Sequence, residues 1–382
     1  MNFSFMTASA ILFERGAHKR LGEIVAPMGK KALVLHGASL AEEIKNALTA
    51  SLDKNGVEYV LLQNPSGEPE AEYVDKAVDA FCANNCDVIV AIGGGSVIDT
   101  AKAASGLVTN GGVLKDYLEG VGIGKKIVND PVPFVAMPTT HGTGAEVTKN
   151  AVIGSAAQHF KKSIRDDRLL PNKVIVDAEL MVSLPQKATA NCSLDALTQL
   201  IEAYTSSKAN AMTDALCISG LEAAARSIYT AYDHGGNLDA REDMAYASLM
   251  SGICLANAGL GAVHGIAPAL GITYGISHGE SCALMLDHVM EYNLPYAVKK
   301  YARIGRILTG KDIADDDEAA LAAVEYVRAL KAHMGIAKDL KHLGIGEADI
   351  DVLVSRCSSN SMNANPVKLD KAEVAELIRK RI

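Results

Sequence analysis

The 382-residue sequence lacks the features of several protein classes. It has no basic excess: 37 lysines and arginines against 45 acidic residues give a net charge of −8, which argues against binding to the phosphates of nucleic acid. No apolar run reaches the ~18 residues of a membrane helix, and Met1–Ser4 lacks the basic start of a signal peptide. The sequence therefore predicts a cytoplasmic protein with no nucleic-acid partner and no membrane partner.

A pattern of paired cysteines is also absent. The seven cysteines are odd in number and include no CxxC pair. Cys82 and Cys86 stand four residues apart on a predicted helix, and we interpret nearly all of the cysteines as small buried thiols. There is no low-complexity tract and no repeat of fixed period. With 49% hydrophobic and 21% charged residues, the composition is that of a folded globular protein long enough for two domains.

The chain does contain a strand–turn–helix pattern, DVIVAIGGGSVIDTAK, at residues 87–102. The apolar residues Val88–Ile92 have the length of a buried strand. Gly93–Gly95 follow as a tight turn, and Ser96 with Asp99 predicts a capping box that opens a helix. Free N–H groups at such a helix start bind anions, usually the phosphate of a nucleotide. The alternative is an ordinary buried strand with a flexible turn.

Strand patterns alternate with helical patterns through the first half of the chain. The expected strands cover residues 2–12, 31–36, 57–63, 88–92, 133–137 and 174–176. This alternation predicts a parallel sheet covered by helices on both faces. Ligands bind beyond the carboxyl ends of such strands. The turn at Gly93 and the loop at residues 138–146 both follow strands, so we expect both at that edge.

The composition changes near Pro185, after which Ala, Leu and Met are frequent and helical periodicity dominates. We place a boundary at about residue 183. Residues 1–183 are predicted to form an α/β domain with a Rossmann-like parallel sheet, and residues 184–382 an all-helical domain. The cleft between two such domains is the natural place for a substrate.

Polar side chains recur on one predicted helix of the second half. Asp195 and Gln199 are four residues apart, so they share a helix face, and Glu202 lies one turn further on. Taken alone, this spacing indicates the polar face of an amphipathic helix.

Two histidines, His264 and His278, each stand beside a glycine in an apolar stretch. A straight helix would hold them ~21 Å apart, but Pro268, Gly271 and Gly275 break the path and allow the two to come together. Two imidazoles and one carboxylate are the ingredients of a catalytic metal site with an open position. The alternative is a pair of satisfied core histidines.

Several motifs, in the same order, resemble those of the iron-containing (group III) alcohol dehydrogenases, which have the dehydroquinate-synthase-like fold. They are GEP at 67–69, GGGSVIDTAK at 93–102, PTTHGTGAEVT at 138–148, LLP at 169–171 with VIVD at 174–177, and NP at 365–366. The match runs over almost the whole chain. It implies an N-terminal dinucleotide-binding domain, a C-terminal helical domain, and a metal held by one aspartate and three histidines.

The family's metal pattern falls on Asp195, Gln199, His264 and His278, with Gln199 where the family usually has histidine. Gln199 is either a hard, weak amide ligand or no ligand. In the second case the remaining set is similar to that of the zinc-dependent glycerol dehydrogenases. The resemblance thus implies a divalent metal, Fe²⁺ or Zn²⁺.

Proton delivery has no obvious residue. The family often has a further histidine where this chain has Pro268, so the relay role of that histidine does not carry over. His141, in the loop after the strand at 133–137, is either a substitute catalytic group or a loop histidine near the cofactor. Water and the ribose hydroxyls are the other candidates.

The resemblance also implies a cofactor site. The expected contacts are Gly94, Gly95 and Ser96 for the pyrophosphate, Thr139 and Thr140 for the adenine side, and Asp99 and Lys162 in support, whereas Lys102 is expected either to help or to be solvated surface. The strand at 31–36 ends in Gly37-Ala-Ser39, with no acid for the ribose diol. Gly37 and Ser39 therefore admit a 2′-phosphate, so the cofactor is NADP or NAD, with a small preference for NADP(H).

The function implied is a metal-dependent, NAD(P)-linked oxidoreductase that interconverts a small primary alcohol and its aldehyde. The nicotinamide carries the hydride and the metal polarises the carbonyl. Three alternatives stay open: a metal-independent reductase, a dehydroquinate-synthase-like lyase, and a maleylacetate-reductase-like enzyme whose acidic substrate meets Lys149, Lys162 and Arg165. We expect a homodimer or larger homo-oligomer, for which the strand at 2–12 is a candidate contact.

Overall fold

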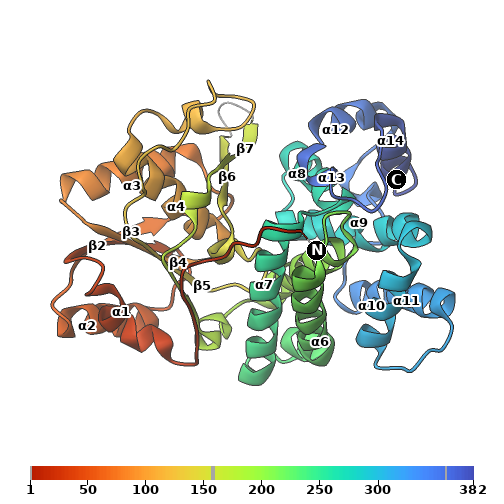
Figure 1. Cartoon of the computed structure of the whole chain (residues 1–382), viewed down its shortest axis with the longest axis horizontal. Coiled ribbons are helices and arrows are strands. Elements are labelled where there is room, and N and C mark those ends of the chain that lie inside the picture. The colour runs from red at the N-terminus through yellow and green to blue at the C-terminus, as the bar shows by residue number, and fades with distance from the viewer. Residues whose placement is uncertain (1, 156–159, 358) are drawn as a thin grey trace. The chain divides into compact units, whose positions relative to one another are not determined.

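The structure, a computed structural model, describes residues 2–155, 160–357 and 359–382. The chain divides into two compact units. The α/β unit consists of Thr7–Thr140 and Gly144–Ser183, and the helical unit consists of the residues up to Met6, His141–Thr143 and Leu184–Ile382. In Figure 1 the α/β unit runs from red to yellow-green and most of the helical unit from green to blue.

A six-stranded parallel sheet forms the centre of the α/β unit. Its strands are β1 (Ile11–Phe13), β2 (Lys31–Gly37), β3 (Glu58–Asn64), β4 (Val88–Gly93), β5 (Phe134–Pro138) and β8 (Lys173–Val176), in the spatial order β1-β8-β5-β4-β2-β3. The order reverses at β2, which has β3 on one side and β4 on the other. In doubly wound sheets such a reversal marks the crevice where ligands bind.

Helices cover both faces of the sheet, which explains the unbroken apolar run in β4. Ile89 and Ala91 point into a core shared with α3 (Ala71–Ala83) and α4 (Gly95–Asn110). Val88, Val90 and Ile92 point the other way, toward α1 (Leu21–Val25) and α2 (Glu42–Lys54). Figure 1 shows these helix pairs on opposite sides of the strands. The predicted α/β fold class is confirmed.

The start of the chain differs from the prediction. The expected strand over residues 2–12 is wrong, because only Ile11–Phe13 are extended in the sheet. This strand pairs with β8 of the same chain, with Ile11 opposite Val174. Three apolar residues form this edge strand because the neighbouring β8 supplies its ladder.

An antiparallel hairpin was not predicted from the sequence. It consists of β6 (Asn150–Ser155) and β7 (Phe160–Arg165), with Ile153 opposite Lys162. One face of the hairpin is buried against α4, whereas β7 carries charged residues on its other face, and this half-polar pattern hides it in the sequence.

All regular elements in the described part of Leu184–Ile382 are helices, as predicted. They are α5 (Gln186–Thr205), α6 (Ala211–Asp233), α7 (Leu238–Ala258), α8 (Ala262–Tyr274), α9 (His278–Asn293), α10 (Val298–Thr309), α11 (Asp316–His333), α12 (Ile350–Arg356), α13 (Ser359–Met362) and α14 (Lys371–Arg379), with short 3₁₀ turns between them. Among the described residues no single helix is long and apolar enough to span a membrane. Helices α7 and α8 together have the necessary length and apolar character, but they are bent by 105°.

Candidate functional site

The turn after β4 and the loop after β5 lie at the same edge of the sheet, as predicted, and the end of β2 lies beside them. His36 is opposite Ile92, and Gly93 is opposite Pro138, so the three strands end side by side. The N–H of Thr139 donates to the carbonyl of Gly93 over 3.0 Å and ties the loop after β5 to the glycine turn.

Helix α4 begins earlier than the capping-box pattern predicts. Its N-cap is Gly94, with no side-chain cap, so the predicted box formed by Ser96 and Asp99 is wrong. The first N–H groups of a helix have no intrahelical acceptor, and here no side chain of the N-cap residue satisfies them. This leaves the helix start free to meet an anion.

Close packing explains the glycines of this turn. A Cβ on Gly93 would lie 2.4 Å from Cγ2 of Val97, so the valine would have to shift. A Cβ on Gly94 would lie 3.3 Å from Cγ2 of Thr140, so the two predicted cofactor residues are neighbours. Ser96 Oγ accepts a hydrogen bond from Asn64 Nδ2 at 3.4 Å. The structure thus brings Gly94, Ser96 and Thr140 to one edge, next to the end of β2, which Gly37 closes and the exposed Ser39 follows.

Lys102 is fully buried, so the expectation of a solvated surface lysine is wrong. Its ammonium is satisfied by oxygens of the segment after β5 and of β6: Ala145 O at 2.8 Å, Thr148 Oγ1 at 3.0 Å and Asn150 O at 2.7 Å. Burial lowers the pKa of Lys102. The lysine therefore fastens α4 to the hairpin instead of facing solvent.

Asp99 and Glu146 belong to the same buried polar group. Asp99 Oδ2 accepts from the N–H of Val152 at 2.9 Å, and Asp99 Oδ1 lies 3.4 Å from Lys102 Nζ. Burial raises the pKa of Asp99, and it raises the pKa of Glu146 to about 7. Both oxygens of the Asp99 carboxylate therefore have partners inside the α/β unit. Lys162, by contrast, is exposed on β7.

In the helical unit, the polar residues of α5 face the interior. Asp195, Gln199 and Glu202 are all nearly inaccessible to solvent. The interpretation of a solvated polar helix face is therefore wrong, because other helices of the unit cover this side. Three polar side chains buried on one face need partners inside the unit.

His264 and His278 come together through a sharp turn between two helices. Helix α8 ends at Tyr274, and its C-cap Gly275 has a φ of 69°. Ser277 caps the start of α9 by accepting from the N–H of Glu280. The two imidazole rings are 5.3 Å apart between centroids. The predicted break at Pro268 and Gly271 is wrong, since α8 runs through both; the left-handed glycine alone turns the chain.

Four potential ligand atoms meet within 4.8 Å of one another: Asp195 Oδ1, His264 Nε2, His278 Nε2 and Cys282 Sγ. Asp195 Oδ1 is 3.3 Å from His264 Nε2 and 3.7 Å from His278 Nε2. Cys282 Sγ is 3.8 Å from each of the two Nε2 atoms. Sequence reasoning missed Cys282, although its place four residues after His278 on a helix was the available signal.

Glu202 fixes the orientation of His264. The Nδ1–H of His264 donates to Glu202 Oε2 at 2.7 Å, and the other carboxylate oxygen accepts from the N–H of Val263 at 2.7 Å. With its proton on Nδ1, a neutral His264 directs the lone pair of Nε2 at the carboxylate of Asp195. A lone pair facing a carboxylate is favourable only with a proton or a cation between them.

The pKa values of His264 and Asp195 reflect the approach of the imidazole nitrogen to the carboxylate. Burial alone lowers the pKa of His264, yet Cys282, Asp195 and Glu202 together raise that pKa well above its usual value. Burial works against ionised Asp195 too, but the two histidines lower the pKa of its carboxyl. The cluster favours a positive charge at its centre.

Gln199 borders the cluster through its amide. Its Nε2 donates to Asp195 Oδ1 at 3.2 Å, and its Oε1 accepts from Ser251 Oγ at 2.7 Å. Both ends of the amide are thus in use.

His141 is fully buried in the helical unit, with Nε2 at 3.1 Å from Ser193 Oγ. Burial, assisted by the positive charge of Arg241, lowers the pKa of His141 to about 3. The imidazole is therefore neutral near pH 7.

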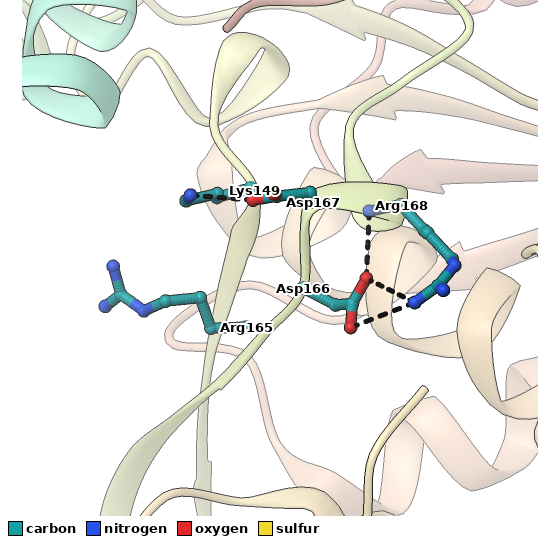
Figure 2. A pocket seen from close by; sticks show the side chains of 5 residues that line it. All are labelled: Lys149, Arg165, Asp166, Asp167 and Arg168. Atoms are coloured by element: carbon teal, nitrogen blue, oxygen red, sulfur yellow. Dashed lines mark hydrogen bonds and ion pairs between the residues drawn. The ribbon is translucent and has the colours of Figure 1, made fainter. Parts of the chain in front are cut away.

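A hollow on the α/β unit is lined by charged residues, which Figure 2 shows: Lys149, Arg165, Asp166, Asp167 and Arg168. Its cations are paired with acids. Lys149 Nζ lies 2.7 Å from Asp167 Oδ1, and Arg165 Nε donates to Glu119 Oε1 at 3.1 Å. An acidic substrate would have to displace these carboxylates, so the hollow gives no support to the alternative of a maleylacetate-reductase-like enzyme.

A parallel sheet with a glycine turn at its ligand-binding edge, and a buried carboxylate–imidazole cluster in a helical unit, are the parts of a dinucleotide-linked, metal-dependent oxidoreductase. Comparison with known proteins agrees. Residues 8–178 match the model of the family "Iron-containing alcohol dehydrogenase", and residues 189–382 match that of the "Fe-containing alcohol dehydrogenase family, C-terminal".

Relatives match over nearly the full chain. The NAD-dependent methanol dehydrogenase of Bacillus methanolicus is 35% identical, over 98% of this chain and 99% of that protein. The 1,3-propanediol dehydrogenase of Citrobacter freundii is 34% identical, over 99% of this chain and 98% of that one. A crystal structure of 1,3-propanediol oxidoreductase superposes with a TM-score of 0.94 at 33% identity, over 100% of both chains.

The chain belongs to the iron-containing alcohol dehydrogenase family. It is an alcohol dehydrogenase or aldehyde reductase that works with a nicotinamide cofactor. The predictions of family, dehydroquinate-synthase-like fold and reaction class are confirmed, and the lyase alternative is not supported.

Proposed function

We propose that Asp195, His264 and His278 bind a divalent metal ion and that the enzyme interconverts a small primary alcohol and its aldehyde with NAD or NADP. The observation that carries the proposal is the meeting of these three side chains around one point in the helical unit, with the donor atoms 3.3 and 3.7 Å from Asp195 Oδ1. Relatives that act on methanol and on 1,3-propanediol support a short, unbranched substrate.

The donor atoms suit such an ion. Metal bonds of about 2.0–2.2 Å in a tetrahedral arrangement place neighbouring nitrogen and oxygen ligands about 3.3–3.6 Å apart, which is close to the spacing in the cluster. The hydrogen bond from His264 Nδ1 to Glu202 selects the tautomer that offers Nε2, the carboxylate–histidine–metal arrangement of many metalloenzymes.

When bound, the ion supplies Lewis acidity to the carbonyl oxygen, and the nicotinamide supplies the hydride. The residues provide the placement. Asp195 and the two imidazoles present their donor atoms to one point; Glu202 prevents His264 from rotating; and the Gln199 amide holds Asp195 Oδ1 through its Nε2. Because two of the three ligands are neutral, the set does not cancel the charge of the ion.

The cofactor is proposed to bind the α/β unit at the carboxyl edge of the sheet. The uncapped start of α4 at Gly94 and Gly95, with Ser96 in its first turn, suits the pyrophosphate. Thr140 lies beside Gly94, and Thr139 is hydrogen-bonded to Gly93. Gly37 closes β2, and Ser39 comes two residues later. Supporting contacts by Asp99 and Lys162 remain predictions. Without an acid after β2, both NAD and NADP are admitted.

Proton delivery is proposed to bypass His141. With a pKa of about 3, His141 is almost entirely neutral near pH 7, so it has no imidazolium proton to give to an alkoxide. The hydrogen bond of His141 to Ser193 instead supports α5, the helix that carries Asp195. Solvent water and the ribose hydroxyls of the cofactor are the remaining donors.

Metal dependence is the decisive test. Purified enzyme is assayed for oxidation of NADH and NADPH with a panel of short aldehydes, before and after exhaustive chelation, together with elemental analysis. We expect activity to fall with metal content and to return when Zn²⁺ or Fe²⁺ is restored. Full activity in metal-free enzyme would overturn the metal mechanism while leaving the nicotinamide chemistry in place.

A further inference from the structure

We propose that Cys282 is the fourth metal ligand of this enzyme, binding as a thiolate and completing an Asp–His–His–Cys set with Asp195, His264 and His278. This inference rests on the proposed function, because it names the chemistry of the same site. It assigns to Cys282 the role that a histidine fills elsewhere in the family, at the position of Gln199, and it predicts a site with a preference for zinc.

The position of Cys282 favours a ligand over a packing residue. Its side chain is fully buried. Among the residues that the structure describes, Sγ lies 3.8 Å from the Nε2 atoms of His264 and His278. Helix α9 sets this arrangement, because Cys282 lies one turn after His278, so both side chains project from one face toward Asp195.

Other buried cysteines of the helical unit differ in this respect. Cys254, on α7, is equally buried, and its Sγ donates to the carbonyl of Thr213 at 3.5 Å. No metal-ligand group of at least three histidine, cysteine or acidic side chains includes Cys254 among the residues that the structure describes. Cys254 is the packed thiol that the sequence predicts, whereas Cys282 faces three further ligand atoms.

The spacing around Cys282 agrees with direct coordination. A metal–sulfur bond of about 2.3 Å and a metal–nitrogen bond of about 2.0–2.1 Å place sulfur and nitrogen about 3.5 Å apart at the tetrahedral angle. Both Sγ–Nε2 distances are 3.8 Å, a few tenths of an ångström longer. Movement of the thiol by this amount needs no change of helix position.

The Gln199 amide is the competing fourth donor. Its Nε2 faces Asp195, and its Oε1 is held by Ser251. The single proton of Ser251 Oγ has two acceptors in reach, Gln199 Oε1 at 2.7 Å and the carbonyl of Ser248 at 2.8 Å. Rotation of the amide by half a turn would present Oε1 to the cluster, but Asp195 Oδ1 would lose the hydrogen bond from Nε2. Cys282 needs no such exchange, so we assign the ligand role to the thiolate and a positioning role to Gln199.

A thiolate changes the chemistry of the site. Binding of M²⁺ to the Cys282 thiol forms the metal–sulfur bond and releases one proton to solvent, so binding tightens as pH rises. Asp195 and the thiolate together balance the two positive charges, which leaves a weaker Lewis acid than an Asp–His₃ set. Soft sulfur favours zinc over harder ions.

Cobalt provides a readout that is independent of turnover. The enzyme is stripped of metal and loaded with one equivalent of Co²⁺, and its near-ultraviolet absorption is recorded for the wild type, Cys282→Ser and the matched control Cys254→Ser. We expect a thiolate-to-cobalt charge-transfer band in the wild type and in Cys254→Ser, and its loss in Cys282→Ser. Cobalt bound by the wild type without this band would overturn the proposal.

X-ray absorption at the zinc edge of the wild-type enzyme avoids any dependence on the folding of a variant. One sulfur at about 2.3 Å is the expected result, and a shell of nitrogen and oxygen alone would contradict it. In Cys282→Ser we expect zinc affinity to fall by at least the ~10- to 100-fold typical of outer-shell changes. Absence of any stoichiometric metal would instead refute the proposed function itself, so the two failures are distinguishable.

Discussion

Glu202 and His264 are joined by a buried 2.7 Å hydrogen bond across 62 residues of sequence. The same carboxylate accepts from the N–H of Val263, so it holds both the imidazole and the first turn of α8. A charge that is buried in this way must be paired. This pair decides which nitrogen of His264 faces Asp195, and with it whether the cluster can bind a cation.

We predict that Glu202→Gln weakens metal binding about 10- to 100-fold while the fold is kept. The single amide oxygen of glutamine can accept from only one of the two donors, His264 Nδ1–H or the N–H of Val263, and it carries no negative charge to strengthen the donor power of the imidazole. Competition with a coloured chelator measures the affinity, and circular dichroism checks the fold.

Glu222→Gln is the matched control, because Glu222 is an exposed glutamate of the same unit. It should bind metal as the wild type does. Unchanged affinity in Glu202→Gln would show that the bond between Glu202 and His264 serves packing and not the ion.

A pair of glycine substitutions separates cofactor binding from stability. In Gly94→Ala the new Cβ lies 3.3 Å from Thr140, a contact that a small shift relieves, but the methyl group occupies space over the helix start. We expect cofactor affinity to fall on the order of tenfold, or about 1.4 kcal/mol, with little change in Tm. Fluorescence titration with NADH and thermal unfolding measure the two effects.

Gly93→Ala should behave in the opposite way. Its Cβ would meet Val97 Cγ2 at 2.4 Å, so the strain falls on the core and costs about 1–3 kcal/mol of stability. If both variants lost stability equally and kept their affinity for NADH, the start of α4 would not be the pyrophosphate site.

The sequence was sufficient for the sheet because β2, β4 and β5 are apolar runs that end in glycine or proline, and their parallel pairing follows from alternation with helices. It was also sufficient to predict that His264 and His278 come close together, since a glycine between two helices signals a turn. It could not show that the face of α5 is buried, because helical spacing alone does not reveal what packs against a polar stripe.

Other features depend on contacts between distant segments. Lys102 looks like a surface residue until β6 supplies its acceptors, and β6 was not predicted. Cys282 looks like any buried thiol until α8 brings His264 to it. The start of α4 at Gly94 was not predicted, and Asp99, expected in the capping box, accepts from the N–H of Val152 instead.

The buried Glu146 should make the stability of the α/β unit depend on pH. Burial raises its pKa in the folded state from 4.5 to about 7. Folded protein therefore binds the proton more tightly than unfolded protein does. The resulting stabilisation is complete below pH 4.5 and is lost as pH rises through about 7. The full difference corresponds to roughly 3 kcal/mol.

Urea unfolding at mildly acidic and mildly alkaline pH measures this effect in the wild type and in Glu146→Gln, whose amide does not titrate. The variant should lose less stability than the wild type on going to alkaline pH. Glu72→Gln, at an exposed glutamate of α3, is the control and should follow the wild type. Parallel pH curves for all three proteins would mean that Glu146 titrates normally.

The end of β2 should determine the choice between NAD and NADP. No acid follows this strand: Gly37 closes it and the exposed Ser39 comes two residues later. An acid at this place holds the ribose diol of NAD and repels a 2′-phosphate. We therefore expect Ser39→Asp to lower kcat/KM for NADPH about tenfold or more, since like charges that face each other cost on the order of 1 kcal/mol or more, while kcat/KM for NADH is kept or improved.

Ser39→Asn, equal in size but neutral, should change the ratio of the two values little. Equal losses with both cofactors in Ser39→Asp would place the adenosine ribose elsewhere, and a loss in Ser39→Asn as large as in Ser39→Asp would assign the effect to shape and not to charge.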